Sequence, residues 1–328
     1  MMDKSIVAEA VKKYHIVPTK IKLLGGFDNN VFECIGMKGF FILKFYDTSK
    51  YSSTSIKVEL DWIRHLQDFG LTVTAPIPSI QGNLIETVWG KSEAKYDVVA
   101  YEKANGKLVN DTNPTEWNDE LFYLWGKTMG QMHQAAKNFQ LPDDTFQPLQ
   151  WNKEEIVVNP PEEVGNTVLL RWNEYIGEME QLPKDAHSYG FIHHDLHQQN
   201  FYVDDSKFVL FDFGDGVYHW FANDIAISLY HAIQSLRVKD PENRKEFAIT
   251  FLASFLKGYR KENELEEKWL LKVPFFVQYR QIYSYVYFLK YLTCEVINNE
   301  KTSFILQHMK EHIEAGIPYV NISTNDIK

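Results

Sequence analysis

The spacing of apolar residues in the first hundred positions predicts several short strands and one helix. Residues 54–69 place apolar side chains three and four positions apart, as one face of a helix does. The runs typical of strands are rich in aromatic and β-branched residues and lie at 20–24, 30–35, 40–46, 84–89 and 96–102. A Pro- and Gly-containing loop at 74–83 separates the helix from the last two strands.

The rest of the chain has a helical pattern for most of its length. A long amphipathic run begins near residue 115, and further helices are predicted across 222–315. Strands and loops are predicted between these helices only at 190–215. The stretch ANGK at 104–107 has the composition of a linker, so the change of pattern coincides with a boundary.

Length and pattern together predict two lobes. A chain of 328 residues with 45% hydrophobic positions is long for one core and can bury two. We therefore predict an α+β protein with a small, β-rich N-terminal lobe at 1–104. A larger, mostly helical C-terminal lobe is predicted at 105–328.

The sequence predicts a cytoplasmic protein outside the membrane. The first residues carry charges and lack the apolar core of a signal peptide. No run approaches the roughly 18 uncharged apolar residues that a membrane span needs. Only Cys34 and Cys294 are present, in no metal-type spacing, which argues against a disulfide framework and suits a reducing compartment.

The charge balance differs between the two parts of the chain. Residues 1–110 hold 14 Lys and Arg against 12 Asp and Glu, and residues 111–328 hold 20 against 32. Nucleic-acid binding would need clustered cations, so this excess of acids argues against it. The acidic second part suits a cationic substrate or a divalent metal, and solubility alone explains it equally well.

Two neighbouring stretches carry the residues best suited to chemistry. They read FIHHDLHQQNF at 191–201 and KFVLFDFGD at 207–215, and apolar residues flank polar ones in both. Asp195, Asn200 and Asp212 could converge from the two sides of the hairpin that these stretches predict. Oxygen ligands of this kind suit Mg²⁺, which takes few protein ligands and completes its shell with phosphates and water.

The spacing of these residues resembles the protein-kinase-like superfamily. His193, Asp195 and Asn200 match HxDxxxxN, and residues 212–214 match DFG. Only 12 residues separate Asn200 from Asp212, and no A-P-E segment follows. The chain is therefore more similar to small-molecule kinases of the aminoglycoside phosphotransferase and choline kinase type, and the resemblance implies their bilobal kinase-like fold.

The resemblance also implies a role for each matching residue. Asp195 falls at the position of the catalytic base, which accepts the proton of the attacking hydroxyl. Asn200 and Asp212 fall at the positions that hold Mg²⁺ against the phosphates of ATP. His193 would brace the catalytic loop. Asp224 would support the same loop, although its place at the start of a helical run equally suits an N-cap.

Lys44 and Glu59 are charged residues in otherwise apolar patterns. Lys44 lies within the strand-like run 40–46, and Glu59 lies in the apolar stripe of the helix at 54–69. An unpaired charge at either place would be costly, so the two are natural partners. In the family such a pair directs the Lys to the ATP phosphates. The alternative is a solvated Lys and a Glu that reaches to water.

The turn before residue 30 and the stretch near 102 match two further nucleotide-binding positions of the family. Gly25, Gly26, Asn29 and Asn30 occupy the place of the phosphate-covering loop, although the pattern departs from G-x-G-x-x-G. A plain hairpin turn is the alternative.

The stretch YEKANG at 101–106 resembles the hinge between lobes. Backbone groups near Glu102 and Ala104 would meet the edge of adenine. The same residues could simply form a linker.

Two further patterns have competing explanations. His193 and His197 have a spacing found in zinc pairs, but the segment supplies no matching third ligand. Aromatic residues four apart, with Arg280 beside them, form a stripe that would suit an amine or quaternary ammonium ion or serve in ordinary helix packing: Tyr279, Tyr283, Tyr287 and Tyr291.

The combined prediction is an ATP- and Mg²⁺-dependent phosphotransferase. Its acceptor would be the hydroxyl of a small molecule: an amino alcohol, an amino acid, a sugar or an aminoglycoside-like compound, with a cationic acceptor favoured by the acidic lobe. One alternative is a catalytically silent kinase-like protein that binds nucleotide or acts as a scaffold. A protein kinase is the other, and the missing A-P-E segment argues against it. The sequence predicts neither an oligomeric state nor substrate-binding residues.

Overall fold

The computed structural model describes residues 4–14, 21–26, 30–36, 39–90, 94–141, 148–236 and 240–327. Contacts within the chain divide it into two compact units, and each is described by itself. The first unit comprises Met1–Lys107, Gln140–Gln147 and Tyr202–Gly214. The second unit comprises Leu108–Phe139, Pro148–Phe201 and Asp215–Lys328.

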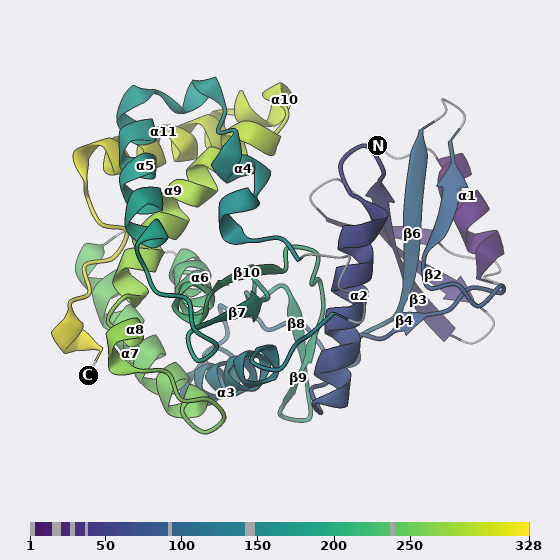
Figure 1. The fold of residues 1–328 in the computed structure, drawn as a ribbon, viewed down its shortest axis with the longest axis horizontal. Helices are drawn as coiled ribbons and strands as arrows, with labels where there is room; N and C mark the ends of the chain where they lie inside the picture. The colour runs from purple at the N-terminus through teal and green to yellow at the C-terminus, as the bar shows by residue number, and fades with distance from the viewer. Residues whose placement is uncertain are drawn as a thin grey trace. The chain divides into compact units, whose positions relative to one another are not determined.

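The first unit is built on an antiparallel sheet with the strand order β1-β2-β3-β6-β4, in which β5 also pairs with β6 (Figure 1). The strands are β1 (Ile21–Gly25), β2 (Val31–Gly36), β3 (Gly39–Asp47), β4 (Pro76–Ile77), β5 (Glu86–Trp89) and β6 (Lys95–Glu102). Every predicted strand is present. The two-residue β4 lies inside the predicted loop, where its short length and its proline gave no strand pattern.

Two helices belong to the first unit, whereas the pattern predicted one. The predicted helix is α2 (Ser53–Asp68), capped by the Ser52 side chain, which accepts a hydrogen bond from Ser55 N. The additional helix is α1 (Lys4–Lys13). Its buried face packs with strand residues such as Leu43 into one core, and the helical residues of this face are Ile6, Val7, Ala10 and Val11. The expectation of a single helix was therefore wrong.

The second unit is mostly helical, as predicted. Its helices of eight residues or more are α3 (Asp119–Ala136), α5 (Asn166–Glu180), α6 (Phe221–Gln234), α7 (Pro241–Tyr259), α9 (Val273–Tyr291) and α11 (Glu300–Ala315). Shorter turns are η1 (Trp151–Lys153), α4 (Glu155–Val158), η2 (Glu162–Val164), α8 (Glu267–Leu270), α10 (Cys294–Ile297) and η3 (Thr324–Asp326). No helix among the described residues is long and apolar enough to cross a membrane.

Glycines let α3 and α7 pack closely. A Cβ at Gly126 would lie 1.8 Å from Phe255 O, and one at Gly258 would lie 1.9 Å from Tyr123 O. Since real Cβ atoms do not approach oxygen so closely, only glycine fits at these two positions. The contact fixes α3 against α7, and both helices carry residues that reach the site described below.

Two small two-stranded sheets flank the polar motifs. In the second unit β7 (Tyr189–Ile192) pairs antiparallel with β10 (Val217–Trp220). The other pair is β8 (Phe201–Asp204) with β9 (Lys207–Leu210). The HxDxxxxN residues lie between β7 and β8, and Asp212 follows β9. The hairpin β8–β9 groups with the first unit, where β-bridges join Leu210 to Val73 and Val203 to Lys107.

Candidate active site

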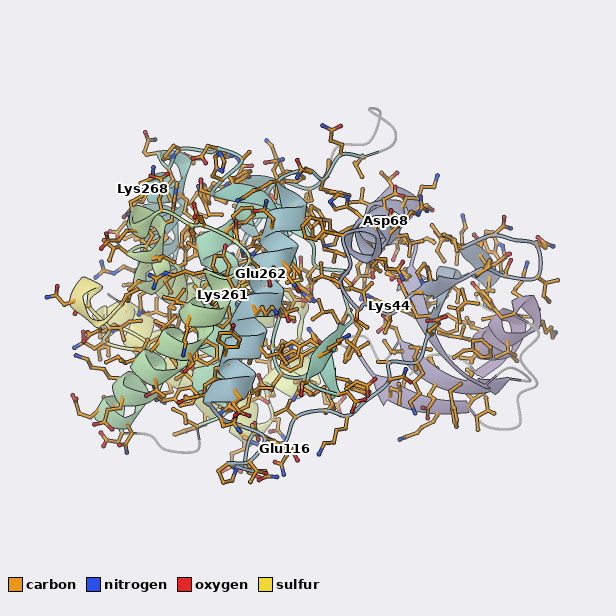
Figure 2. The ribbon with its side chains drawn as sticks, turned by 90° about the horizontal axis from the view of Figure 1, so that it is seen from below. Lys44, Asp68, Glu116, Lys261, Glu262 and Lys268 are labelled. Carbon is orange, nitrogen blue, oxygen red and sulfur yellow. The ribbon has the colours of Figure 1, made fainter. Side chains whose placement is uncertain are left out.

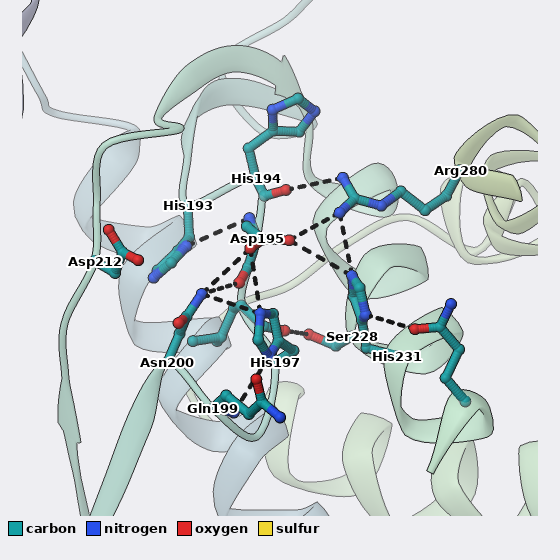
Figure 3. A network of polar contacts seen from close by, with 12 residues as sticks. His193, His194, Asp195, His197, Gln199, Asn200, Asp212, Ser228, His231 and Arg280 are labelled. Atoms are coloured by element: carbon teal, nitrogen blue, oxygen red, sulfur yellow. Dashed lines mark hydrogen bonds and ion pairs between the residues drawn. The ribbon is translucent and has the colours of Figure 1, made fainter. Parts of the chain in front are cut away.

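The carboxylate of Asp195 lies at the centre of a polar network in the second unit (Figure 3). Arg280 Nη2 donates to its Oδ1 over 2.8 Å. Its Oδ2 lies 3.2 Å from His197 Nε2 and 3.3 Å from Asn200 Nδ2. Burial alone would raise the pKa of Asp195, but the hydrogen bond with His197 and the charge of Arg280 hold it well below its ordinary value. Asp195 is therefore an anion at neutral pH.

The loop that carries Asp195 is held by its own polar groups. Asn200 Nδ2 donates to the Asp195 carbonyl oxygen over 2.8 Å, and Asn200 N donates to His197 O over 2.8 Å. His193 Nδ1 accepts from Asp195 N at 3.4 Å, and the bracing role of His193 stays a prediction. His194 has φ 67°, a left-handed conformation that is uncommon away from glycine. Strain of this kind persists only where the surroundings hold the backbone in place.

Asp224 binds the backbone of the loop that carries Asp195. It is fully buried in α6, and its carboxylate accepts from His194 N at 3.0 Å and from His193 N at 3.2 Å. Helix α6 begins at Phe221, and no side chain caps it, so the N-cap explanation for Asp224 does not apply. Asp224 thus fixes two consecutive backbone amides next to Asp195.

A chain of hydrogen bonds continues from Asp224 through α3 and α7. Asn263 Nδ2 donates to Tyr259 Oη over 2.7 Å, and the Tyr259 hydroxyl donates to His133 Nδ1 over 2.8 Å, because the ionised Asp224 can only accept and so places the His133 proton on Nε2. His133 Nε2 then carries the proton and donates to Asp224 Oδ2 over 3.2 Å. Burial lowers the pKa of His133, so the ring is neutral. Hydrogen bonding to His133 lowers the pKa of Asp224 despite its burial, so that carboxyl is charged.

This network predicts a large loss of stability when Asp224 is changed. In Asp224→Asn the amide would turn a donor toward N–H groups, leaving buried donors unpaired. We expect a loss of about 3 kcal/mol, because each buried donor left unpaired costs about 1–3 kcal/mol. Tyr259→Phe is the matched control, and it should cost about 2 kcal/mol because it removes two neutral hydrogen bonds, with His133 and with Asn263. Thermal melting compares the two variants; an Asp224→Asn melting temperature no lower than that of Tyr259→Phe would contradict the assigned role.

In the first unit, Lys44, whose position is labelled in Figure 2, contacts two carboxylates. Its Nζ lies 3.3 Å from Glu59 Oε1 and 2.8 Å from Asp212 Oδ1. Burial alone would lower the pKa of Lys44, but the charges of Asp212 and Glu59 raise it well above its ordinary value. The Lys44 side chain is 15% exposed and that of Glu59 6%, so the alternative of two solvated charges is wrong.

Two tyrosines complete the surroundings of Glu59. Tyr46 donates to Glu59 Oε2 over 2.9 Å, and Tyr101 donates to Glu59 Oε1 over 3.2 Å. Sequence analysis missed both, although the period of two does place Tyr46 on the same face of β3 as Lys44. The carboxylate of Glu59 therefore has three donors and is held firmly against Lys44.

Asp212 lies in the loop after β9 with an unusual backbone. Its φ is 64°, in the left-handed region, and its side chain is 48% exposed. A Cβ on Gly214 would lie 2.8 Å from Lys44 Nζ, so the glycine of the DFG pattern leaves room for the lysine. The structure thus joins Lys44, Glu59 and Asp212 in the first unit, and it joins His193, Asp195, Asn200 and Asp224 in the second.

The structure gives the positions of most of the other residues predicted to contact the nucleotide, but their contacts with the nucleotide stay predictions. Asn30 Nδ2 donates to Phe45 O over 2.7 Å, which ties the end of the β1–β2 turn to β3. Gly25 and Gly26 have φ 135° and 85°, as a glycine turn allows, whereas Asn29 lies outside the described residues.

Glu102 N donates to Ala75 O over 2.9 Å, so only the carbonyl of Glu102 could serve adenine. Ala104 follows β6 in irregular backbone. The adenine contacts of both residues stay predictions.

Glu154 is a buried carboxylate that no sequence pattern marked as a site residue. Its Oε2 accepts from Tyr283 Oη over 2.8 Å and lies 3.8 Å from His194 Nδ1. Its Oε1 has no partner among the described residues. Burial raises the pKa of Glu154 to about 8, and burial lowers the pKa of His194 to about 4. His194 is therefore neutral and does not compensate a charge on Glu154.

The tyrosines of the stripe have different roles: Tyr279 packs against an aromatic ring, and Tyr283 donates a hydrogen bond to Glu154. Tyr279 is buried and stacks on Trp172 with ring centroids 5.4 Å apart. Tyr283 binds Glu154, and Tyr291 is 40% exposed. Ordinary packing, the alternative given for this pattern, therefore accounts for Tyr279 but not for the whole stripe.

The histidines near Asp195 make loop contacts. Gln199 N donates to His197 Nδ1 over 3.2 Å, so the proton of His197 is on Nε2 and faces Asp195 Oδ2. Within the described residues, no group of three or more His, Cys, Asp or Glu side chains is arranged to hold a metal ion.

The chain is similar to known phosphotransferases. A family model described as the phosphotransferase enzyme family matches residues 20–269. Amicoumacin kinase of Bacillus subtilis (strain 168) is 32% identical over 320 residues, covering 96% of this chain and 93% of that protein.

Two solved structures extend the likeness. One is an amicoumacin kinase in complex with AMP-PNP, Ca²⁺ and Ami: it is 31% identical with a TM-score of 0.89, and the match covers 100% of this chain and 98% of that one. A microcompartment-associated aminopropanol kinase is 21% identical with a TM-score of 0.76, and the match covers 95% and 96% of the two chains. At that identity the second likeness concerns the fold.

Proposed function

Because this chain belongs to the phosphotransferase enzyme family, we propose that it transfers the γ-phosphate of ATP to a hydroxyl group of a small molecule. The family suggested by the HxDxxxxN and DFG patterns is confirmed by the family match and by the full-length likeness to amicoumacin kinase. The kinase-like fold and the assignment to the small-molecule kinases are confirmed by the same findings. ATP, Mg²⁺ and the roles of single residues are proposals.

The observation that carries the proposal is the state of Asp195. A carboxylate kept anionic by surrounding donors can accept a hydrogen bond from an acceptor hydroxyl and orient its oxygen toward phosphorus. The acceptor oxygen then forms a bond to the γ-phosphorus, the bond from phosphorus to the ADP oxygen breaks, and the hydroxyl proton passes to Asp195. Because the transition state is loose, orientation counts for more than strong basicity, which suits a carboxyl of low pKa.

Lys44 and Asp212 are proposed to serve the nucleotide from the first unit. Lys44 is held in place by Glu59 and would neutralise charge on the ATP phosphates. The likeness to a kinase solved with AMP-PNP and Ca²⁺ supports the use of a nucleotide and a divalent cation.

The proposed cation ligands fit Mg²⁺ by their donor chemistry. Asp212 offers a half-exposed carboxylate, and Asn200 offers its amide oxygen because its Nδ2 is engaged by Asp195. Hard oxygen donors of these two kinds are what Mg²⁺ takes from proteins. When bound, Mg²⁺ supplies charge neutralisation at the phosphates.

The acceptor is proposed to carry an amine. Glu154 Oε1 and Tyr279 Oη are buried oxygens that have no hydrogen-bond partner among the described residues. A buried carboxylate whose pKa is raised to about 8 gains most from a cation, because an ammonium group restores its charged form. The tyrosines beside Glu154 add aromatic faces that also favour cations.

Glu154 predicts how the use of an amine acceptor depends on pH. The titratable and charged groups that face it are Tyr279, Arg280, Tyr283 and Tyr291 of α9, together with His194 and Asp215. Below pH 8 the carboxyl is protonated and an ammonium group must displace that proton. We therefore expect kcat/KM for an amine acceptor to rise with pH and level off above about pH 8.

Glu154→Gln tests this expectation. It should lower kcat/KM for the amine acceptor about 10- to 100-fold, since a hydrogen bond to a charged group is worth about 1.5–3 kcal/mol. It should also remove the rise with pH. Controls are Glu155→Gln, the exposed neighbouring carboxyl, and a diol matched to an amino alcohol. An unchanged pH profile in Glu154→Gln would refute the amine site.

The proposed function as a whole is tested with an acceptor panel. The panel contains amicoumacin and aminopropanol, after the similar kinases, together with choline, homoserine, sugars and aminoglycosides. ADP release from Mg²⁺-ATP that depends on one acceptor supports the kinase. ATP binding without any transfer would favour the silent scaffold, against which the presence of Lys44, Asp195, Asn200 and Asp212 already argues.

A further inference from the structure

Among the described residues, Arg280 is the one Lys or Arg side chain that binds Asp195, and the proposed function gives it no task. It lies in the middle of α9, 85 residues from Asp195 in the chain, and it is 9% exposed. Its Nη2 donates to Asp195 Oδ1 over 2.8 Å, and its Nη1 donates to His194 O over 3.3 Å. Two atoms of the loop that carries Asp195 are therefore bound by one planar group.

His231 aims this guanidinium. Gln234 Oε1 lies 3.0 Å from His231 Nδ1 and can only accept, so the proton of His231 is on Nδ1. His231 Nε2 then has a lone pair and accepts from Arg280 Nη2 over 3.1 Å. Burial lowers the pKa of His231 to about 4, which keeps the ring neutral and this acceptor intact. His231 thus binds Arg280 rather than donating to Asp195.

The two oxygens of Asp195 are consequently held by different elements. Oδ1 is bound by Arg280 of α9, and Oδ2 is bound from within the loop by His197 Nε2 and Asn200 Nδ2. A carboxylate held at both ends cannot rotate about its Cβ–Cγ bond without breaking a hydrogen bond. Arg280 Cζ also lies 5.3 Å from the centroid of the Tyr283 ring, and this cation–π contact further limits the movement of the guanidinium group.

We propose that Arg280, aimed by His231, is a positioning residue that fixes the plane of the Asp195 carboxylate against the acceptor hydroxyl. It acts through Asp195 and does not itself bind the acceptor. The inference rests on the proposed function, since it assumes that Asp195 orients the hydroxyl. Lysine cannot replace Arg280 here, because a single ammonium group does not hold the carboxylate, His231 and the His194 carbonyl in one plane.

The test measures kcat and both KM values for Arg280→Ala and Arg280→Lys. Misplacing a reacting group by about 1 Å can cost about 100-fold, so we expect Arg280→Ala to lower kcat about 100-fold. The KM values for ATP and the acceptor should stay within about threefold. Methylguanidinium added to Arg280→Ala should recover part of kcat, which a purely structural role would not predict. Lys272→Ala, a surface cation at the start of α9 paired with Glu178, is the matched control.

Each outcome decides the matter. A kcat within about threefold of wild type, a loss confined to the KM of the acceptor, or a loss that methylguanidinium does not reverse overturns the inference. If Arg280→Ala does not fold, Arg280→Lys decides: kcat about tenfold lower with unchanged KM supports it, and wild-type kcat overturns it. Asp195→Asn distinguishes failure of the Arg280 inference from failure of the proposed function, because wild-type turnover in that variant refutes the proposed function itself.

Discussion

Asp195→Asn is expected to lower kcat by about 10³-fold or more while ATP binding stays close to wild type. The asparagine amide keeps the size of the side chain but cannot take a proton from the acceptor hydroxyl. It also turns a donor toward Arg280 or His197, both of which donate to Asp195 in the wild-type protein. Positioning and proton acceptance are thus lost together.

The measurement is kcat and the shift in melting temperature that ATP produces, for wild type and Asp195→Asn side by side. Asp119→Asn, an exposed carboxyl at the start of α3, is the control for a neutral substitution and should behave as wild type. Turnover within tenfold of wild type in Asp195→Asn would remove this residue from the centre of the mechanism. A lost ATP shift would mean instead that the substitution damages nucleotide binding.

Asp212→Asn is expected to have the second largest effect, and on a different step. The variant loses the charge that Lys44 contacts at 2.8 Å and one proposed oxygen ligand for Mg²⁺. We expect kcat to fall about 10³-fold and the stabilisation of the protein by ATP with Mg²⁺ to disappear, because a ligand stabilises a protein only when its concentration exceeds the Kd.

The matched control is Asp205→Asn in the β8–β9 turn, where φ is 42° and asparagine is tolerated. Melting is measured with ATP alone and with ATP plus Mg²⁺. If Asp212→Asn responds to Mg²⁺-ATP as wild type does, Asp212 does not bind the cation. The contrast with Asp195→Asn, in which the shift persists, separates nucleotide binding from chemistry.

The sequence predicted the parts of the site that depend on local patterns. Lys44 and Glu59 are charges in apolar stripes, so their pairing followed from the cost of burying either one alone. The loop from His193 to Asn200 has a fixed spacing, and its internal hydrogen bonds depend on that spacing. Asp224 was left with two explanations, and only the contacts with the backbone of the loop decided between them.

Residues that join the site from distant elements could not be predicted in this way. Arg280 reaches Asp195 because α9 packs beside α6, and nothing local to the pattern around Arg280 encodes that packing. His231 lies in a buried helix, where a histidine is ordinarily a core residue. Glu154 precedes a helix of four residues, too short for a periodic pattern to mark its buried side.

The fold shows the same limit. The longer strands were predicted from their composition, whereas the two residues of β4 are too few to form a recognisable pattern. Helix α1 was not predicted because its apolar face contains only four residues, although those residues pack into the core beside the sheet. The grouping of residues 202–214 with the first unit depends on β-bridges to Val73 and Lys107, which are distant in the chain.

The most direct test of the central claim is transfer of labelled phosphate from [γ-³²P]ATP to the acceptor panel, with Asp195→Asn as the blank. We predict a labelled small-molecule product from at least one hydroxylated amine in the presence of Mg²⁺, and none above background in Asp195→Asn. A labelled product formed equally by Asp195→Asn would contradict the mechanism. Label that appears only in a protein substrate, or no response to ATP of any kind, would contradict the proposed function itself.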